Sequence, residues 1–158
     1  MTTPTELLQA ARERELTLVT AESCTGGLIA GALTDIVGSS DVVWGGYVTY
    51  ANSAKLALGV DETLLALHGA VSEPVARSMA EAALRASGVD VAVAVTGVAG
   101  PGGGTEHKPV GLVHFATAQR GGPTVPHVER YGDLGRAEVR ARAVQTAIDL
   151  LYAAVTGV

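Results

Sequence analysis

Ala21-Glu22-Ser23-Cys24-Thr25-Gly26-Gly27 is the stretch that decides the fold, because it turns a short apolar strand abruptly into an apolar helix. The pattern predicts the strand over residues 16–21 and the helix over residues 25–34. Ser23 then stands at the carboxyl end of a strand, where the free N–H groups of a helix N-terminus can face a ligand. Two interpretations stay open: Ser23 is a nucleophile, or a hydroxyl of the turn simply caps the helix.

The bulk composition is typical of one globular domain packed with small residues. The chain has 158 residues, of which 47% are hydrophobic and only 4% aromatic, so a single domain over residues 1–158 is expected. A net charge of -5 and the scarcity of aromatic side chains argue against nucleic acid as a partner. No segment has the pattern of a membrane span or a signal peptide. With a single cysteine, the composition predicts a cytoplasmic protein.

Helical and strand patterns alternate along the early part of the chain. Strands are predicted over residues 16–21, 42–50, 89–95, 110–118 and 124–131, and helices over 5–14, 25–34, 52–58, 61–67, 72–87 and 135–155. The continuous apolar run 89–95 is typical of a central strand that is covered on both faces. The order predicts an α/β fold, a three-layer α/β/α sandwich around a mixed, largely parallel central sheet with a possible late hairpin. Gly45-Gly46 indicates a bulge or a close backbone approach.

A second polar segment, Thr49 to Lys55 (TYANSAK), follows the strand predicted over 42–50. Lys55 is one of only two lysines beside nine arginines, and lysine can lose its proton when it is desolvated, whereas arginine cannot. If the strands at 16–21 and 42–50 are neighbours, Ser23, Tyr50 and Lys55 meet at one edge of the sheet. A neutral lysine or a tyrosine phenolate can take the serine proton. The alternative is that Tyr50 packs and Lys55 is solvated.

A glycine-rich loop, Thr96 to Thr105 (TGVAGPGGGT), directly follows the predicted central strand. Such a loop lets backbone N–H groups approach a phosphate or an oxyanion closely. Its spacing matches neither the P-loop nor the dinucleotide-binding motif. The candidate substrate-binding residues of this loop are Thr96, Gly97, Gly100, Gly102 and Gly103, and the alternative is a flexible lid.

Arg140 lies on the apolar stripe of the last predicted helix, one turn before Val144, and Arg136 lies a further turn back. A cation that faces inward needs a partner. A phosphate would satisfy Arg140, and so would Asp133 or Glu138, and both possibilities stay open.

The four histidines and the single cysteine show no ligand spacing, so neither a metal nor a cofactor is expected. Cys24 is an alternative nucleophile, because a nearby helix N-terminus lowers the pKa of a thiol. It has no histidine partner at motif level, and a structural cysteine that faces inward is the preferred interpretation.

Five segments of the chain form a recognisable set: TAESCTGG (20–27), GSSDVVWGGYVTYANSAK (38–55), HGAVSEPVA (68–76), VTGVAGPGGGTEHKPVG (95–111) and RAEVR (136–140). Together they closely resemble the CinA C-terminal-domain family, whose members include the nicotinamide mononucleotide deamidases. The resemblance extends from about Leu7 to Leu151, and its motifs are long and specific.

The resemblance implies an amidohydrolase that converts nicotinamide mononucleotide to nicotinate mononucleotide and ammonia, as in pyridine nucleotide salvage. By motif position, Ser23 would be the nucleophile, and Tyr50 and Lys55 would complete the catalytic group. The proton transfers between Lys55 and Tyr50 stay unassigned.

The same resemblance assigns substrate-binding residues. N–H groups near Thr25, Gly26 and Gly27 would stabilise the tetrahedral oxyanion, an effect of about 3 kcal/mol per donor in other enzymes. The glycine-rich loop and Arg140 would hold the nucleotide, with Arg140 at the phosphate.

Three departures from the family pattern stand out. Gly132 to Arg136 (GDLGR) carries two extra residues, Leu134 and Gly135, which leaves the role of Arg136 open. Thr96 stands where a serine is also common in the family. Many relatives carry a large N-terminal domain, whereas a stand-alone domain is expected here.

The rival interpretation is a non-catalytic module that binds a pyridine nucleotide or a protein partner in a competence or damage response. Retention of Ser23, Tyr50 and Lys55 favours the enzyme. Because small enzymes of this kind often form symmetric assemblies, a homo-oligomer is expected.

Overall fold

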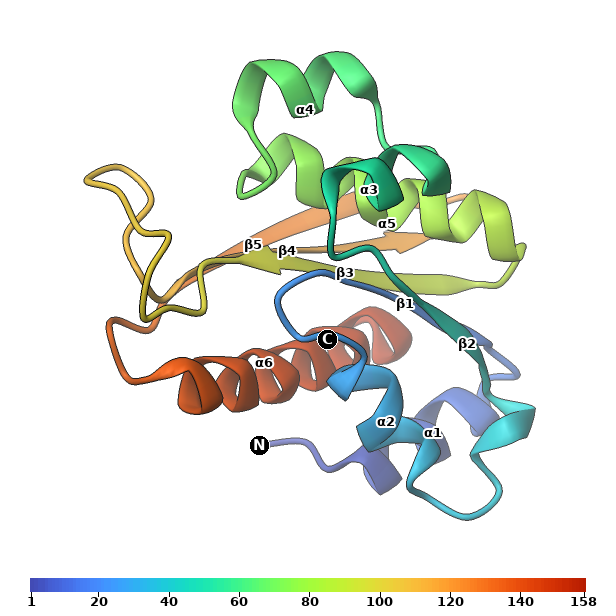
Figure 1. The fold of residues 1–158 in the computed structure, drawn as a ribbon. Coiled ribbons are helices and arrows are strands. Elements are labelled where there is room, and N and C mark those ends of the chain that lie inside the picture. Colours follow the sequence, from blue (N-terminus) through green and yellow to red (C-terminus); the bar gives the residue numbers. More distant parts are fainter.

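The computed structural model describes residues 1–158 and places a five-stranded sheet between two layers of helices (Figure 1). The strands are β1 (Leu18–Glu22), β2 (Val43–Val48), β3 (Val91–Gly97), β4 (Leu112–Gln119) and β5 (Thr124–Arg130). The helices are α1 (Pro4–Glu13), α2 (Leu28–Thr34), α3 (Asn52–Leu58), α4 (Glu62–His68), α5 (Glu73–Ser87) and α6 (Arg136–Thr156), with a short 3-10 helix, η1, at Ser39–Asp41. The order across the sheet is β2-β1-β3-β4-β5.

The sheet separates two apolar clusters, one under each helical layer. Helices α1, α2 and α6 cover one face, where Phe115 and Leu151 are fully buried. Helices α3, α4 and α5 lie over the other face, where Met79 and Ala92 are fully buried (Figure 1). Each layer buries its apolar side against the sheet, which is the driving force for this layered architecture. The predicted three-layer α/β/α sandwich with a mixed sheet is confirmed.

Parallel and antiparallel pairing divide the sheet evenly. Strand β1 pairs in parallel with β2 and with β3, whereas β3 pairs antiparallel with β4 and β4 antiparallel with β5. The parallel part of the sheet is therefore smaller than the largely parallel sheet that the sequence predicts. The physical reason lies in the connections, because a parallel pair needs a long crossover, usually a helix, and no helix separates β3, β4 and β5.

The glycine pair in β2 serves both purposes that the sequence suggests. Leu18 pairs with Val43 and Val19 pairs with Gly45, so Trp44 is the extra residue of a bulge. A Cβ at Gly46 would lie 2.5 Å from Thr20 Oγ1 and 3.1 Å from the Cβ of Ala30. Strand β2 therefore approaches β1 and α2 more closely than a side chain permits.

Helix α2 begins at Leu28, three residues later than the pattern predicts. Gly26 and Gly27 have φ values of 57° and 103°, a left-handed conformation that other residues rarely adopt. The chain therefore makes a tight turn after Ser23 before the helix can start. None of the helices combines the length and the apolarity needed to cross a membrane.

Candidate functional site

The polar segments singled out in the sequence gather at one end of the sheet. The turn after β1, the segment after β2 and the glycine-rich loop after β3 all leave the carboxyl ends of parallel strands. Figure 1 shows the turn after β1, the glycine-rich loop and the first turn of α6 at this same end. In open α/β sheets such an edge is where ligands bind.

Ser23 and Lys55 are in direct contact, as predicted from the expected pairing of their strands. Lys55 Nζ donates a hydrogen bond to Ser23 Oγ at 2.9 Å. It also donates to the backbone carbonyl oxygens of Thr49 at 2.7 Å and of Tyr50 at 3.2 Å. Both side chains are buried, with Ser23 8% and Lys55 1% exposed. The lysine is thus held by three oxygen atoms, and one of them belongs to the candidate nucleophile.

No carboxylate forms an ion pair with Lys55. Burial disfavours its charged form and lowers the pKa of the ammonium group from its ordinary value. A lysine with a lowered pKa has a larger neutral fraction, and the neutral amine is the form that can accept a proton. The environment therefore suits Lys55 to act as a base toward Ser23.

Glu22, directly before Ser23, is fully buried and holds the turn through hydrogen bonds. Its carboxylate accepts hydrogen bonds from the hydroxyls of Thr20 and Thr25 at 3.0 Å and 2.7 Å. It also accepts from the backbone N–H groups of Ile29 and Ala30, both at 2.9 Å. These two N–H groups of the first turn of α2 therefore bind a carboxylate of the same chain and are not available to a ligand.

The backbone N–H of Cys24, by contrast, is free to bind a ligand. Among the N–H groups of the turn, that of Ser23 donates to Val95 and that of Gly26 donates to Ser23. The N–H groups of Cys24, Thr25 and Gly27 have no acceptor within the protein. Cys24 directly follows Ser23 and lines the same cavity, so its N–H is the free donor nearest to Ser23 along the chain.

The Cys24 thiol is a poor nucleophile in this setting. Burial raises its pKa to about 11, which keeps the thiol protonated near neutral pH. The side chain is 5% exposed and belongs to the apolar cluster that contains Phe115 and Leu151. These observations favour the structural interpretation of Cys24 over the nucleophilic one.

Arg140 holds the turn rather than lining the cavity. Its Nε donates to the carbonyl oxygen of Cys24 at 3.0 Å, and its Nη2 donates to that of Thr25 at 3.3 Å. A Cβ at Gly26 would lie only 3.1 Å from Nη2 of Arg140. Arg140 therefore faces inward as predicted, but its contacts in this structure are backbone carbonyls, and neither Asp133 nor Glu138 pairs with it.

A cavity of about 200 Å³ connects the candidate groups. Its lining comes from the segments of Ser23 and Lys55 and from three other segments: Ser23, Cys24, Tyr50, Asn52, Lys55, Ala70, Val71, Thr96, Gly97, Ala99 and Arg136. Thr96 donates from its hydroxyl to the carbonyl oxygen of Ala70 at 2.9 Å, which fixes one wall. The volume lies below the usual range for drug-sized ligands, so the cavity admits one ring and its substituent rather than a whole nucleotide.

The Tyr50 hydroxyl does not contact Ser23. Its ring is exposed, and its oxygen accepts a hydrogen bond from Arg136 Nη2 at 3.0 Å. Tyr50 is linked to the Ser23–Lys55 pair through its backbone carbonyl oxygen, which accepts a hydrogen bond from Lys55. Of the three predicted catalytic residues, Ser23 and Lys55 meet through their side chains and Tyr50 lies at the rim.

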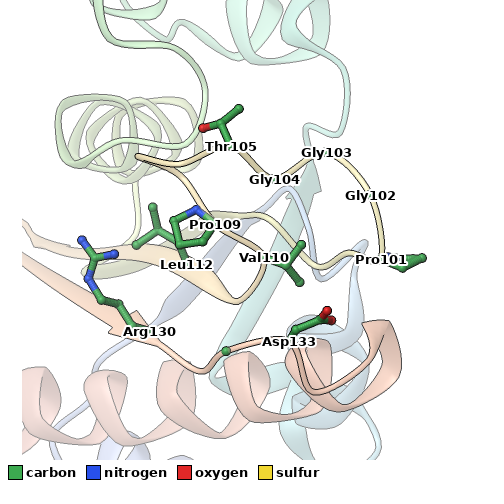
Figure 2. A pocket seen from close by; sticks show the side chains of 11 residues that line it. Pro101, Gly102, Gly103, Gly104, Thr105, Pro109, Val110, Leu112, Arg130 and Asp133 are labelled. Carbon is green, nitrogen blue, oxygen red and sulfur yellow. The ribbon is translucent and has the colours of Figure 1, made fainter.

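The predicted glycines divide between two cavities. Gly97 lines the cavity of Ser23, whereas Gly102 and Gly103 line a second, more open cavity of about 570 Å³ together with Val110, Arg130 and Asp133. Figure 2 shows the glycine-rich loop over this second cavity, with the side chains of Arg130 and Asp133 well apart from each other below the loop. Gly100 lines neither cavity, and its carbonyl oxygen accepts a hydrogen bond from Arg136.

Several lining residues were not singled out from the sequence. Asn52, Ala70, Val71 and Ala99 carry no chemical signal that separates them from ordinary loop residues. The sequence did indicate Arg136 as a candidate, because it lies at the start of the helix that also carries Arg140. The two extra residues before it left its role open. No group of three His, Cys, Asp or Glu side chains is arranged to hold a metal ion.

Comparison with known proteins identifies the family of the chain. Residues 2–155 match the model of the CinA C-terminal domain family. A CinA-like protein of a Synechococcus species is 55% identical over 148 residues, which is 92% of this chain and 35% of the relative. The chain spans about a third of the length of the curated relatives that it matches.

Solved structures of the superfamily have the same fold. The competence/damage inducible protein CihA of Agrobacterium tumefaciens superposes with a TM-score of 0.88 at 52% identity, covering 97% of this chain and 98% of that one. A CinA-superfamily protein of Klebsiella pneumoniae gives a TM-score of 0.91 at 34% identity, covering 99% and 100%. The family match and these likenesses span nearly every residue described above, and the chain belongs to the CinA C-terminal domain family.

Proposed function

We propose that this domain is an amidohydrolase that converts nicotinamide mononucleotide to nicotinate mononucleotide and ammonia, with Ser23 as nucleophile. One observation carries the proposal: a serine and a lysine share a 2.9 Å hydrogen bond inside a small cavity, and no carboxylate neutralises the lysine. A serine hydroxyl needs a base before it can attack an amide. The family resemblance supplies the substrate.

The hydrogen bonds around Lys55 support this residue as the base. The carbonyl oxygens of Thr49 and Tyr50 can only accept, so a neutral amine directs its two hydrogens toward them. Its lone pair then faces Ser23 Oγ and can receive the hydroxyl proton. Tyr50 contributes through its backbone in this scheme, since its hydroxyl is directed to Arg136.

The proposed reaction has two halves. Ser23 Oγ attacks the amide carbon while its proton passes to Lys55 Nζ, and the tetrahedral oxyanion receives a hydrogen bond from the Cys24 N–H. Lys55 returns the proton to the leaving nitrogen, the C–N bond breaks, and ammonia departs. Water then attacks the acyl-serine ester with Lys55 again as base, which releases the carboxylate and restores Ser23.

Ammonia release from nicotinamide mononucleotide by the purified chain, without added metal, tests the proposal. Wild type and Cys24→Ala should release ammonia, and Ser23→Ala should release none while it stays folded. Turnover by Ser23→Ala at the wild-type rate would contradict the serine mechanism. If folded wild type binds the nucleotide but releases no ammonia, the domain is a binding module.

A further inference from the structure

Arg136 spans the mouth of the cavity that contains Ser23. Its Nη1 donates to the carbonyl oxygen of Gly100 at 2.9 Å, and its Nη2 donates to the Tyr50 hydroxyl at 3.0 Å. Three segments are joined by this one guanidinium: the first turn of α6, the glycine-rich loop and the segment after β2. The side chain is therefore held in a defined position at the entrance, although its residue is exposed.

Both partners of Arg136 are neutral, so its positive charge is not compensated. No carboxylate lies within ion-pairing distance of Arg136, and Glu138, its neighbour on α6, pairs with Arg142 instead. A guanidinium has five N–H donors, and the two hydrogen bonds to Gly100 and Tyr50 leave three of them free. An arginine with this fork geometry is suited to a phosphate oxygen pair.

The other arginines near this end of the sheet are less suited to the same role. Arg140 donates to two backbone carbonyls of the nucleophile turn and does not line the cavity. Arg130 lines only the second cavity, together with Asp133 and the glycine-rich loop (Figure 2). Only Arg136 shares a cavity with Ser23 and Lys55.

The burial of the side chains that line the cavity matches the shape of the proposed substrate. Ser23 and Lys55 are buried at the closed end, whereas Tyr50 and Arg136 are exposed at the open end. Nicotinamide mononucleotide carries its carboxamide at one end and its phosphate at the other. If the amide reaches Ser23 inside a cavity of about 200 Å³, the ribose phosphate must extend outward past the rim.

We propose that Arg136 binds the phosphate of the substrate and that the Tyr50 hydroxyl positions its guanidinium, so the domain selects phosphorylated amides over phosphate-free ones. This inference rests on the proposed function, and it assigns the phosphate contact to Arg136 rather than to Arg140. Tyr50 then acts on substrate recognition through Arg136 and is a positioning residue.

The test compares two ligands, nicotinamide mononucleotide and the phosphate-free nicotinamide riboside, across four arginine variants. In the Ser23→Ala background, calorimetry gives the Kd ratio of the two ligands, and in the active enzyme kcat/KM gives the same preference. Arg136→Gln should reduce the preference for the phosphorylated ligand at least tenfold, and Arg136→Lys should retain part of it. Two control variants, Arg130→Gln and Arg142→Gln, remove the same charge outside this cavity. They should leave the preference for the phosphorylated ligand at its wild-type value.

If Arg136→Gln weakened the binding of both ligands by the same factor, the assignment of the phosphate contact to Arg136 would be overturned. A wild type that binds both ligands equally well, or binds neither, would overturn it too. Tyr50→Phe provides the second readout. A positioning role predicts a higher KM for the mononucleotide with a smaller change in kcat, whereas a fall in kcat on both ligands would contradict it. Because the Kd ratio needs no turnover, a failure to release ammonia overturns the proposed function without deciding the phosphate contact.

Discussion

At the scale of single residues, the proposed chemistry depends on the charge state of Lys55. Burial lowers the pKa of its ammonium group below the ordinary 10.5. Since only the neutral amine can take the Ser23 proton, kcat/KM should rise with pH around the lowered pKa and level off above it, with the midpoint of the rise below pH 10.5. A pH–rate profile of the wild type measures this. A rise centred on the ordinary lysine value, or a flat profile, would contradict a buried lysine base.

The residue pairs that the sequence predicts are those that follow from neighbouring strands. Ser23 and Lys55 meet because β1 and β2 pair in parallel and release the chain at the same edge. The direction of the Tyr50 side chain could not be predicted, since a residue just after a strand has no fixed periodicity. Helical spacing places Arg136 and Arg140 on one side of α6, but it does not tell which of them reaches the cavity.

At the scale of elements, the junction of β1 and α2 depends on the buried carboxylate of Glu22. Its two oxygens each receive one backbone N–H, from Ile29 and from Ala30. Glu22→Gln replaces one acceptor oxygen with an NH₂ group, so one of these N–H groups loses its partner. The free energy of unfolding should fall by about 2 kcal/mol or more. Urea denaturation measures this, with exposed Glu106→Gln as the matched control, which should change stability by less than about 0.5 kcal/mol.

The bulged strand β2 offers a second prediction at this scale. A Cβ at Gly46 would come within 2.5 Å of the buried Thr20 hydroxyl, which is itself bonded to Glu22. Gly46→Ala should therefore lower the free energy of unfolding by about 1–3 kcal/mol. At Gly45 nothing lies within 4 Å of the added carbon, so Gly45→Ala should be neutral or slightly stabilising. Equal effects of the two changes in thermal unfolding would show that the close approach of β2 is not tight.

Element types were more predictable than element pairing. Helical periodicity, the Ser72 cap and the continuous apolar run of β3 identify their elements from local sequence alone. Whether two strands pair in parallel depends on the path of the connection between them. The loop after β3 is rich in glycine and contains no helix, and β4 returns antiparallel beside β3. The role of Glu22 was not predictable either, because its four partners become neighbours only after the turn has formed.

At the scale of the whole molecule, the cavity is assembled from segments that are distant in the sequence. Its lining extends from Ser23 to Arg136 and draws on the turn after β1, the starts of α3 and α6, and the end of β3. These segments touch only in the folded chain, and the unfolded chain therefore has no binding site. Any ligand of this cavity must stabilise the folded state as a whole through mass action.

Thermal unfolding of Ser23→Ala with increasing nicotinamide mononucleotide tests this coupling without turnover. At a ligand concentration of 100 Kd, mass action adds about 2.7 kcal/mol to the free energy of unfolding. For a chain of this size, that gain should raise Tm by about 5–10 °C. Nicotinamide riboside at the same concentration should raise Tm less, because it cannot reach the charge on Arg136. Equal increases in Tm from both ligands would show that the phosphate makes no contact with the protein. If the mononucleotide did not raise Tm at all, it would not occupy the cavity that joins these segments.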